Sequence, residues 1–113
     1  MTPSQPEDTA RGIVTETLVW RGITVSVSYE VDWLGSGARG SAFAASHLQV
    51  EAIEPERAKL PITETGYRSH FLAPGTVEET GGPAAYVAAW LDHDAQTADW
   101  RRYEAESRQL TLF

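Results

Sequence analysis

Residues 23–33, ITVSVSYEVDW, decide the fold, because apolar and polar side chains alternate through them without a break. Successive side chains of a strand point to opposite faces, so this period of two is typical of a β-strand with one buried face. The preceding run, residues 13–20, IVTETLVW, is rich in β-branched and aromatic residues. Arg21 and Gly22 stand between the two runs, and glycine accepts the positive φ that a tight turn needs. The sequence therefore predicts an antiparallel hairpin.

Two further strands are expected after this hairpin. Residues 42–53 alternate again, and the apolar positions of this run share one face: Ala44, Leu48, Val50 and Ala52. A shorter strand is expected within residues 62–72, and YRSHFL at 67–72 is its clearest part. Its alternation divides the side chains between two faces, Tyr67, Ser69 and Phe71 on one and Arg68, His70 and Leu72 on the other. In an ordinary strand of this kind, Tyr67 and Phe71 would fill the core.

From residue 76 onward the pattern becomes helical. Thr76 is the expected cap of a single helical turn through Glu79, and Pro83 stands where the first turn of a helix tolerates proline. Large apolar residues then recur at helical spacing and predict a helix at about 83–95: Tyr86, Val87, Trp90 and Leu91. Thr97 is the expected N-cap of a second helix at about 98–108. The inner stripe of that helix is Trp100, Tyr103 and Ser107.

Strands first and helices last indicate the α+β class, with an antiparallel sheet of about four strands across residues 13–72 and two C-terminal helices. The 113 residues suffice for one domain, which we place at residues 12–108. Residues 1–11 are polar and contain two prolines, which favours a flexible leader. The chain thus divides into a leader, a domain and, at residues 109–113, a terminal binding peptide.

Composition narrows the function classes. Sixteen acidic and nine basic residues give a net charge of -7, which repels phosphate backbones and argues against direct nucleic-acid binding. No apolar run is long enough to span a bilayer, so no membrane association is expected. The chain has no cysteine, which suits a cytoplasmic protein and excludes thiolate metal sites. The oligomeric state stays open.

No catalytic constellation stands out in the sequence. The three histidines, His47, His70 and His93, match no metal-ligand spacing. If the strands that carry His47 and His70 pair, these two side chains would face each other. No serine sits in a nucleophile elbow. We therefore predict a protein that is not an enzyme, with no catalytic residues, no metal and no cofactor.

A candidate second surface lies on the fourth predicted strand. Tyr67, Arg68 and His70 combine aromatic and cationic groups on a path from loop to strand, and Gly66 shapes the turn before them. Such groups suit recognition of a ligand or a partner. A small-molecule enzyme built on these three side chains is the weakest of the functional hypotheses.

Three segments of the chain are similar to one group of proteins: LPITETGYRSHF at 60–71, GGPAAYVAAWLDHDA at 81–95, and RQLTLF at 108–113. Together they resemble a group of short bacterial proteins often carried on plasmids and other mobile elements. The resemblance covers roughly residues 12–113. It implies a bacterial cytoplasmic protein encoded by a mobile element, and it implies no particular activity.

The last five residues, QLTLF at 109–113, resemble the peptide motif that binds the sliding clamp of bacterial DNA polymerase, usually Gln-Leu-Ser/Asp-Leu-Phe. The resemblance implies that Leu112 and Phe113 enter an apolar cleft of the clamp. Leu110 would pack at the edge of the cleft and the Gln109 amide would anchor the peptide by hydrogen bonding. Thr111 departs from the usual motif but keeps a small hydroxyl. A competing interpretation packs Leu110, Leu112 and Phe113 back onto the domain.

Two functional hypotheses of different classes follow. In the first, the chain is a non-enzymatic bacterial adaptor or modulator that docks on the sliding clamp through residues 109–113. In the second, the acidic domain itself inhibits a nucleic-acid-binding host defence protein, with its carboxylates standing in for phosphates. Inhibition of this second kind would weaken steeply with salt and would survive deletion of residues 109–113.

Overall fold

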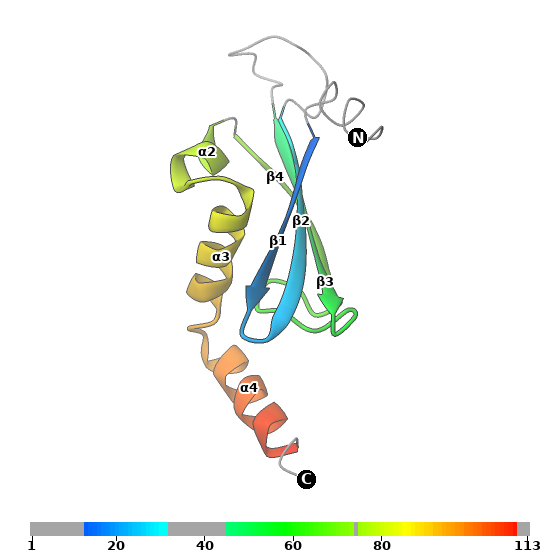
Figure 1. Ribbon diagram of the computed structural model, residues 1–113. Helices are drawn as coiled ribbons and strands as arrows, with labels where there is room; N and C mark the ends of the chain where they lie inside the picture. The colour runs from blue at the N-terminus through cyan, green and yellow to red at the C-terminus, as the bar shows by residue number, and fades with distance from the viewer. Residues whose placement is uncertain (1–12, 32–44, 74, 111–113) are drawn as a thin grey trace.

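The computed structural model describes residues 13–31, 45–73 and 75–110, with the backbone alone for Gln109 and Leu110. Within these residues four strands lie side by side in the order of the sequence, each antiparallel to its neighbour: β1 (Ile13–Trp20), β2 (Ile23–Glu30), β3 (Ser46–Glu54) and β4 (Tyr67–Leu72). The helices α2 (Thr76–Thr80), α3 (Pro83–Asp94) and α4 (Ala98–Leu110) follow. The predicted α+β class is confirmed, with α2 and α3 beside the sheet and α4 beyond its end (Figure 1).

The predicted hairpin forms at the predicted turn. Trp20 pairs with Ile23, and the two residues between them take positive φ, 49° for Arg21 and 83° for Gly22. Two successive positive φ values define the turn whose twist matches that of a two-stranded antiparallel ribbon. The turn therefore fixes the register of β1 on β2.

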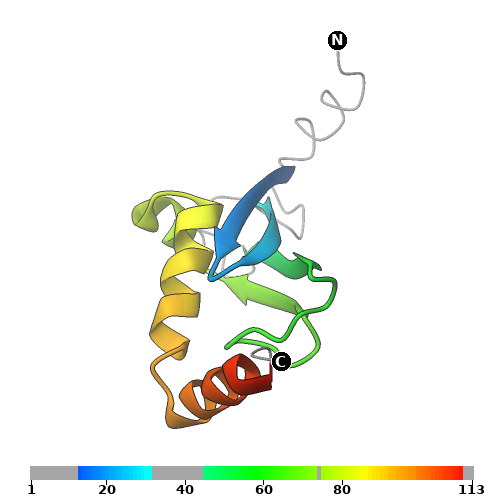
Figure 2. The same cartoon turned by 60° about the horizontal axis from the view of Figure 1, so that its bottom comes forward.

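The alternation also predicts the buried face of β2 and β3 correctly, but it fails at Val31, which follows the end of β2 and is 45% exposed. Val25, Val27 and Tyr29 of β2 are buried, and so are Leu48, Val50 and Ala52 of β3. Helix α3 covers this face with Val87 and Leu91, which are fully buried. Figure 2 shows α3 packed against the sheet on one side. Residues 32–33 at the end of the first predicted run and residues 42–44 at the start of the second lie outside the described residues.

The fourth strand corrects one expectation. Tyr67 and Phe71 do not fill the core, because their side chains are 44% and 51% exposed. The opposite face of β4 turns toward α3 instead, and Leu72 packs against the core from there. The division of the strand into two faces is as predicted, but the face that carries the cation and the imidazole is the inner one.

Two polar contacts hold α3 on the sheet. The side chain of Glu16, on β1, accepts a hydrogen bond of 2.9 Å from the backbone N–H of Ala84 in the first turn of the helix. A carboxylate at this end satisfies a free backbone donor and interacts favourably with the helix dipole. Near the other end of the helix, the indole N–H of Trp20 donates to Asp92 at 2.8 Å. The side chains that make these two hydrogen bonds with α3 both come from β1, 68 and 72 residues away in sequence.

Candidate functional site

Helix α4 begins where the sequence predicts and is held there by aromatic side chains. Thr97 caps it, since its hydroxyl accepts a hydrogen bond of 3.2 Å from the backbone N–H of Trp100. Trp100 is 5% exposed, and its ring centroid lies 5.9 Å from that of Trp20 and 5.0 Å from that of Tyr103. The first turns of α4 are therefore packed against the end of β1.

Two cations flank this aromatic cluster. The guanidinium of Arg21 lies 4.6 Å from the ring of Trp20 and donates to both carboxylate oxygens of Glu104, at 2.8 and 2.9 Å. The ammonium of Lys59 lies 4.3 Å from the ring of Tyr103. Because these groups are partly solvated, each contact adds little free energy, and the buried rings dominate the attachment of the helix.

The predicted terminal peptide starts inside α4. The helix continues to Leu110, past its predicted end at about residue 108, so the backbone of Gln109 and Leu110 belongs to its last turn. Leu112 and Phe113 lie outside the described residues. Ala105 and Glu106, between the aromatic cluster and this last turn, are exposed. The aromatic contacts of α4 with the rest of the domain lie in its first two turns.

A matched pair of substitutions tests the role of the two tryptophans. Trp20 and Trp100 are both 5% exposed, but the indole N–H of Trp20 donates to Asp92, whereas that of Trp100 is buried with no hydrogen-bond partner among the described residues. Trp20→Phe loses a hydrogen bond, and Trp100→Phe removes an unsatisfied donor. We expect Trp20→Phe to lower the free energy of unfolding by about 1 kcal/mol more than Trp100→Phe. Urea unfolding of both variants measures the difference, and a larger loss for Trp100→Phe would contradict it.

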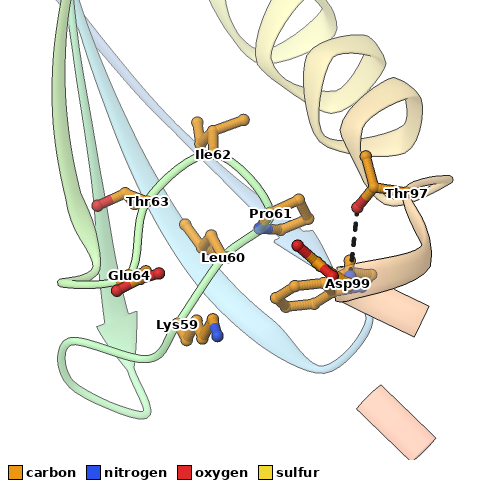
Figure 3. A pocket seen from close by; sticks show the side chains of 9 residues that line it. Lys59, Leu60, Pro61, Ile62, Thr63, Glu64, Thr97 and Asp99 are labelled. Atoms are coloured by element: carbon orange, nitrogen blue, oxygen red, sulfur yellow. Dashed lines mark hydrogen bonds between the residues drawn. The ribbon is translucent and has the colours of Figure 1, made fainter. Parts of the chain in front are cut away.

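A pocket of about 400 Å³ lies between the first turn of α4 and the loop that leads from β3 to β4. Its lining residues are Lys59, Leu60, Pro61, Ile62, Thr63, Glu64, Thr97, Asp99 and Trp100. The loop side is a tight turn, in which Leu60 and Thr63 exchange backbone hydrogen bonds of 2.9 and 3.1 Å. Figure 3 shows the loop residues on one side of the pocket and Thr97 and Asp99 on the other. Sequence reasoning missed this pocket, although it identified both Thr97 and Trp100.

The candidate second surface does not converge as a unit. Tyr67 accepts a hydrogen bond of 3.1 Å from the amide of Gln49 on the face of the sheet away from α3. Arg68 and His70 lie on the other face, where their side chains stand 5.3 and 4.7 Å from the ring of Trp90. Arg68 also donates to the backbone carbonyl of Ile62 at 2.8 Å. The structure thus brings Arg68 and His70 together and separates them from Tyr67.

His70 carries a pH-dependent consequence. Burial lowers the pKa of its imidazole from the ordinary value of 6.5, and the positive charge of Arg68 lowers it further. The folded protein favours the neutral ring. The contribution of the neutral His70 side chain to the free energy of unfolding is therefore present above pH 6.5 and is lost as the pH falls through the lowered pKa. An NMR titration is expected to give a pKa below 6.5 for His70 and a higher value in Arg68→Gln. An unchanged pKa in that variant would exclude the effect of Arg68.

The histidines occupy separate environments. His47 pairs with Phe71 across the strands and His70 pairs with Leu48, so the two imidazoles lie on opposite faces of the sheet. The expectation that they would face each other is therefore wrong. The Nε2 atom of His47 lies 2.6 Å from the hydroxyl of Ser69. Across the described ranges, no group of three or more His, Asp or Glu side chains could hold a metal ion.

Comparison with known proteins identifies a family. The family described as KlcB third domain matches residues 13–100, which include all four strands, α2, α3 and the first turn of α4. KlcB is a plasmid-encoded protein. No curated protein and no solved structure that was compared matches the chain. In the part of the chain that the structure describes, none of the helices has the length and apolar character needed to cross a bilayer. Because the family match at residues 13–100 covers most of the chain, the chain belongs to the KlcB third domain family.

Proposed function

We propose that this KlcB third domain chain is a non-enzymatic, plasmid-encoded accessory protein that docks on the bacterial DNA polymerase sliding clamp through Gln109, Leu110, Leu112 and Phe113. The observation that carries the proposal is the sequence QLTLF at 109–113, which begins within the last turn of α4. Docking would bring the α+β domain to sites of replication, or would block other proteins that use the same cleft.

The attachment of α4 supports this proposal. The aromatic contacts that hold the helix end at Tyr103, and a helix rises 1.5 Å per residue, so Leu110 stands roughly 10 Å further along the axis. A partner can approach the end of such a helix without displacing Trp100 or Tyr103. Helix ends also unwind at low cost, which lets Gln109 and Leu110 adapt their backbone to a cleft.

A pull-down with purified sliding clamp tests the proposal. The wild-type chain should retain the clamp, and the double variant Gln109→Ala/Phe113→Ala should not. A matched control, Arg101→Ala/Glu106→Ala, changes two exposed side chains of α4 outside the peptide and should bind like the wild type. Equal binding by the wild type and the Gln109/Phe113 variant would refute clamp docking through this peptide.

The same variants separate docking from inhibition by the acidic domain. An inhibitor that mimics nucleic acid would act without residues 109–113, and its effect would weaken steeply as salt rises. A clamp-docking adaptor depends on apolar contacts of Leu112 and Phe113, so moderate salt should change its binding little. The pull-down is therefore repeated at low and at high salt.

A further inference from the structure

The free edge of β1 is the surface of the described structure that best fits a second copy of the chain. We propose that two copies pair through this edge as antiparallel strands centred on Thr17, so that their two four-stranded sheets become one. The proposal concerns the folded domain, and it stands whether or not residues 109–113 bind the clamp.

The edge of β1 lacks the protection that edge strands normally carry. In Figure 1 this strand lies in front of the others, and no described strand pairs with its outer side. Natural edges are blunted by proline, lysine, bulges or shortness. β1 is eight residues long, contains neither proline nor lysine, and pairs with β2 in an unbroken register. Its one charged residue, Glu16, turns to the inner face and accepts the hydrogen bond from Ala84.

The other edge of the sheet is less open. β4 has six residues and carries a cation, Arg68. The backbone carbonyl of Tyr67 already accepts hydrogen bonds from the hydroxyls of Thr63 and Thr65, at 2.8 and 3.3 Å. β1 is therefore the edge that a further strand would extend.

The turn after β1 determines which backbone groups of the strand are available. Only two residues join Trp20 to Ile23, and the residues that flank such a turn form a hydrogen-bonded pair. Bonded and non-bonded pairs then alternate, so Thr15, Thr17 and Val19 direct their N–H and C=O groups away from β2. The side chains of these three residues are exposed. All three are β-branched, which favours the pairing of strands.

Charge decides the register of the pair. A two-fold axis between antiparallel copies sets one residue opposite its own copy, and only Glu16 or Thr17 at this centre engages nearly all of β1. A centre at Glu16 would set two carboxylates directly opposite each other, which is destabilising. A centre at Thr17 sets Thr15 opposite Val19 of the other copy, with no like charges directly opposite. The outward backbone groups of all three residues are then hydrogen-bonded.

The flank of α3 above β1 favours a second copy over a single foreign strand. Ala84 and Asp92, which contact β1, lie on one row of the helix with Ala88 between them. The next row outward, Ala85 and Ala89, is exposed. A two-fold axis through the middle of β1 would bring the same flank of the second α3 alongside. Alanine side chains let two helices approach to about 8 Å, so the second copy would cover this flank.

Sedimentation velocity of the full 113-residue chain tests the proposal, at about 0.15 M salt to screen the repulsion between chains of charge -7. We expect the wild type to show a monomer–dimer equilibrium. Thr17→Lys sets two ammonium groups opposite each other and should weaken dimerisation by about tenfold or more. Thr17→Glu should do the same with two carboxylates. An equimolar mixture of these variants should recover the dimer, because opposite charges then meet across the axis.

A matched control and a local measurement complete the test. Gln49→Lys adds the same charge at an exposed position of the inner strand β3 and should dimerise like the wild type. The backbone amides of Thr15 and Val19 should exchange hydrogen slowly in the wild-type dimer and faster in Thr17→Lys.

Three results would overturn the proposal. The first is a wild type that stays monomeric at about 1 mM, even with these amides protected, because a segment of the same chain would then cover the edge. The second is a mixture of Thr17→Lys and Thr17→Glu that stays monomeric. The third is equal weakening by Gln49→Lys. Clamp binding is measured separately, so either proposal can fail alone.

Discussion

Phe113→Ala is expected to weaken binding of the chain to the sliding clamp by about 30-fold or more. An aromatic side chain that fills an apolar cleft is the kind of residue that dominates a small interface, and its truncation also leaves the cleft unfilled. The peptide is short, so few other contacts can compensate.

A graded set of variants makes this prediction specific. Leu112→Ala should produce a loss of the same order, because Leu112 enters the same cleft in the proposed mode. Thr111→Ser keeps the hydroxyl and should bind like the wild type. Titration calorimetry with purified clamp measures all three affinities, with Arg101→Ala/Glu106→Ala as the control. Equal affinities for Phe113→Ala and the control would contradict the proposed role of Phe113.

Gly66→Ala is expected to be the most damaging single substitution in the loop that leads into β4. Gly66 has a φ of 81°, a conformation that costs an alanine about 1–2 kcal/mol. A Cβ at this position would also lie 2.5 Å from the Cα of Arg57, so the backbone of the loop would have to move. That movement would strain the hydrogen bond of 2.8 Å from the Ala52 N–H to the Gly66 carbonyl. We expect the free energy of unfolding to fall by about 3 kcal/mol or more.

Gly22→Ala is the matched control for this substitution. Gly22 has nearly the same φ, 83°, but no atom of the described residues, its chain neighbours aside, lies within 4 Å of a Cβ placed there. Its cost should therefore be the backbone term alone, about 1–2 kcal/mol. Urea unfolding of the two variants compares the losses directly. A loss for Gly66→Ala no larger than that for Gly22→Ala would show that the contact with Arg57 relaxes without cost.

The local elements of this protein follow from its sequence alone. The alternation through residues 23–30 determines a strand with one buried face, and Arg21-Gly22 determines the turn that pairs it with β1. Pro83 and Thr97 mark the starts of α3 and α4 because each acts on the backbone within its own turn. These signals are local, so no other part of the chain is needed to interpret them.

The tertiary structure alone decided which face of β4 is buried and where the polar groups meet. A period of two separates the faces of a strand, but both faces of β4 carry an aromatic or a cationic group, so the pattern cannot choose between them. The choice depends on α3, whose Trp90 packs on Arg68 and His70. The contact of Glu16 with Ala84 and the contact of Trp100 with the loop at residues 59–64 also depend on how the helices pack on the rest of the domain. Contacts between distant segments arise from the packing of whole elements, which local side-chain patterns do not encode.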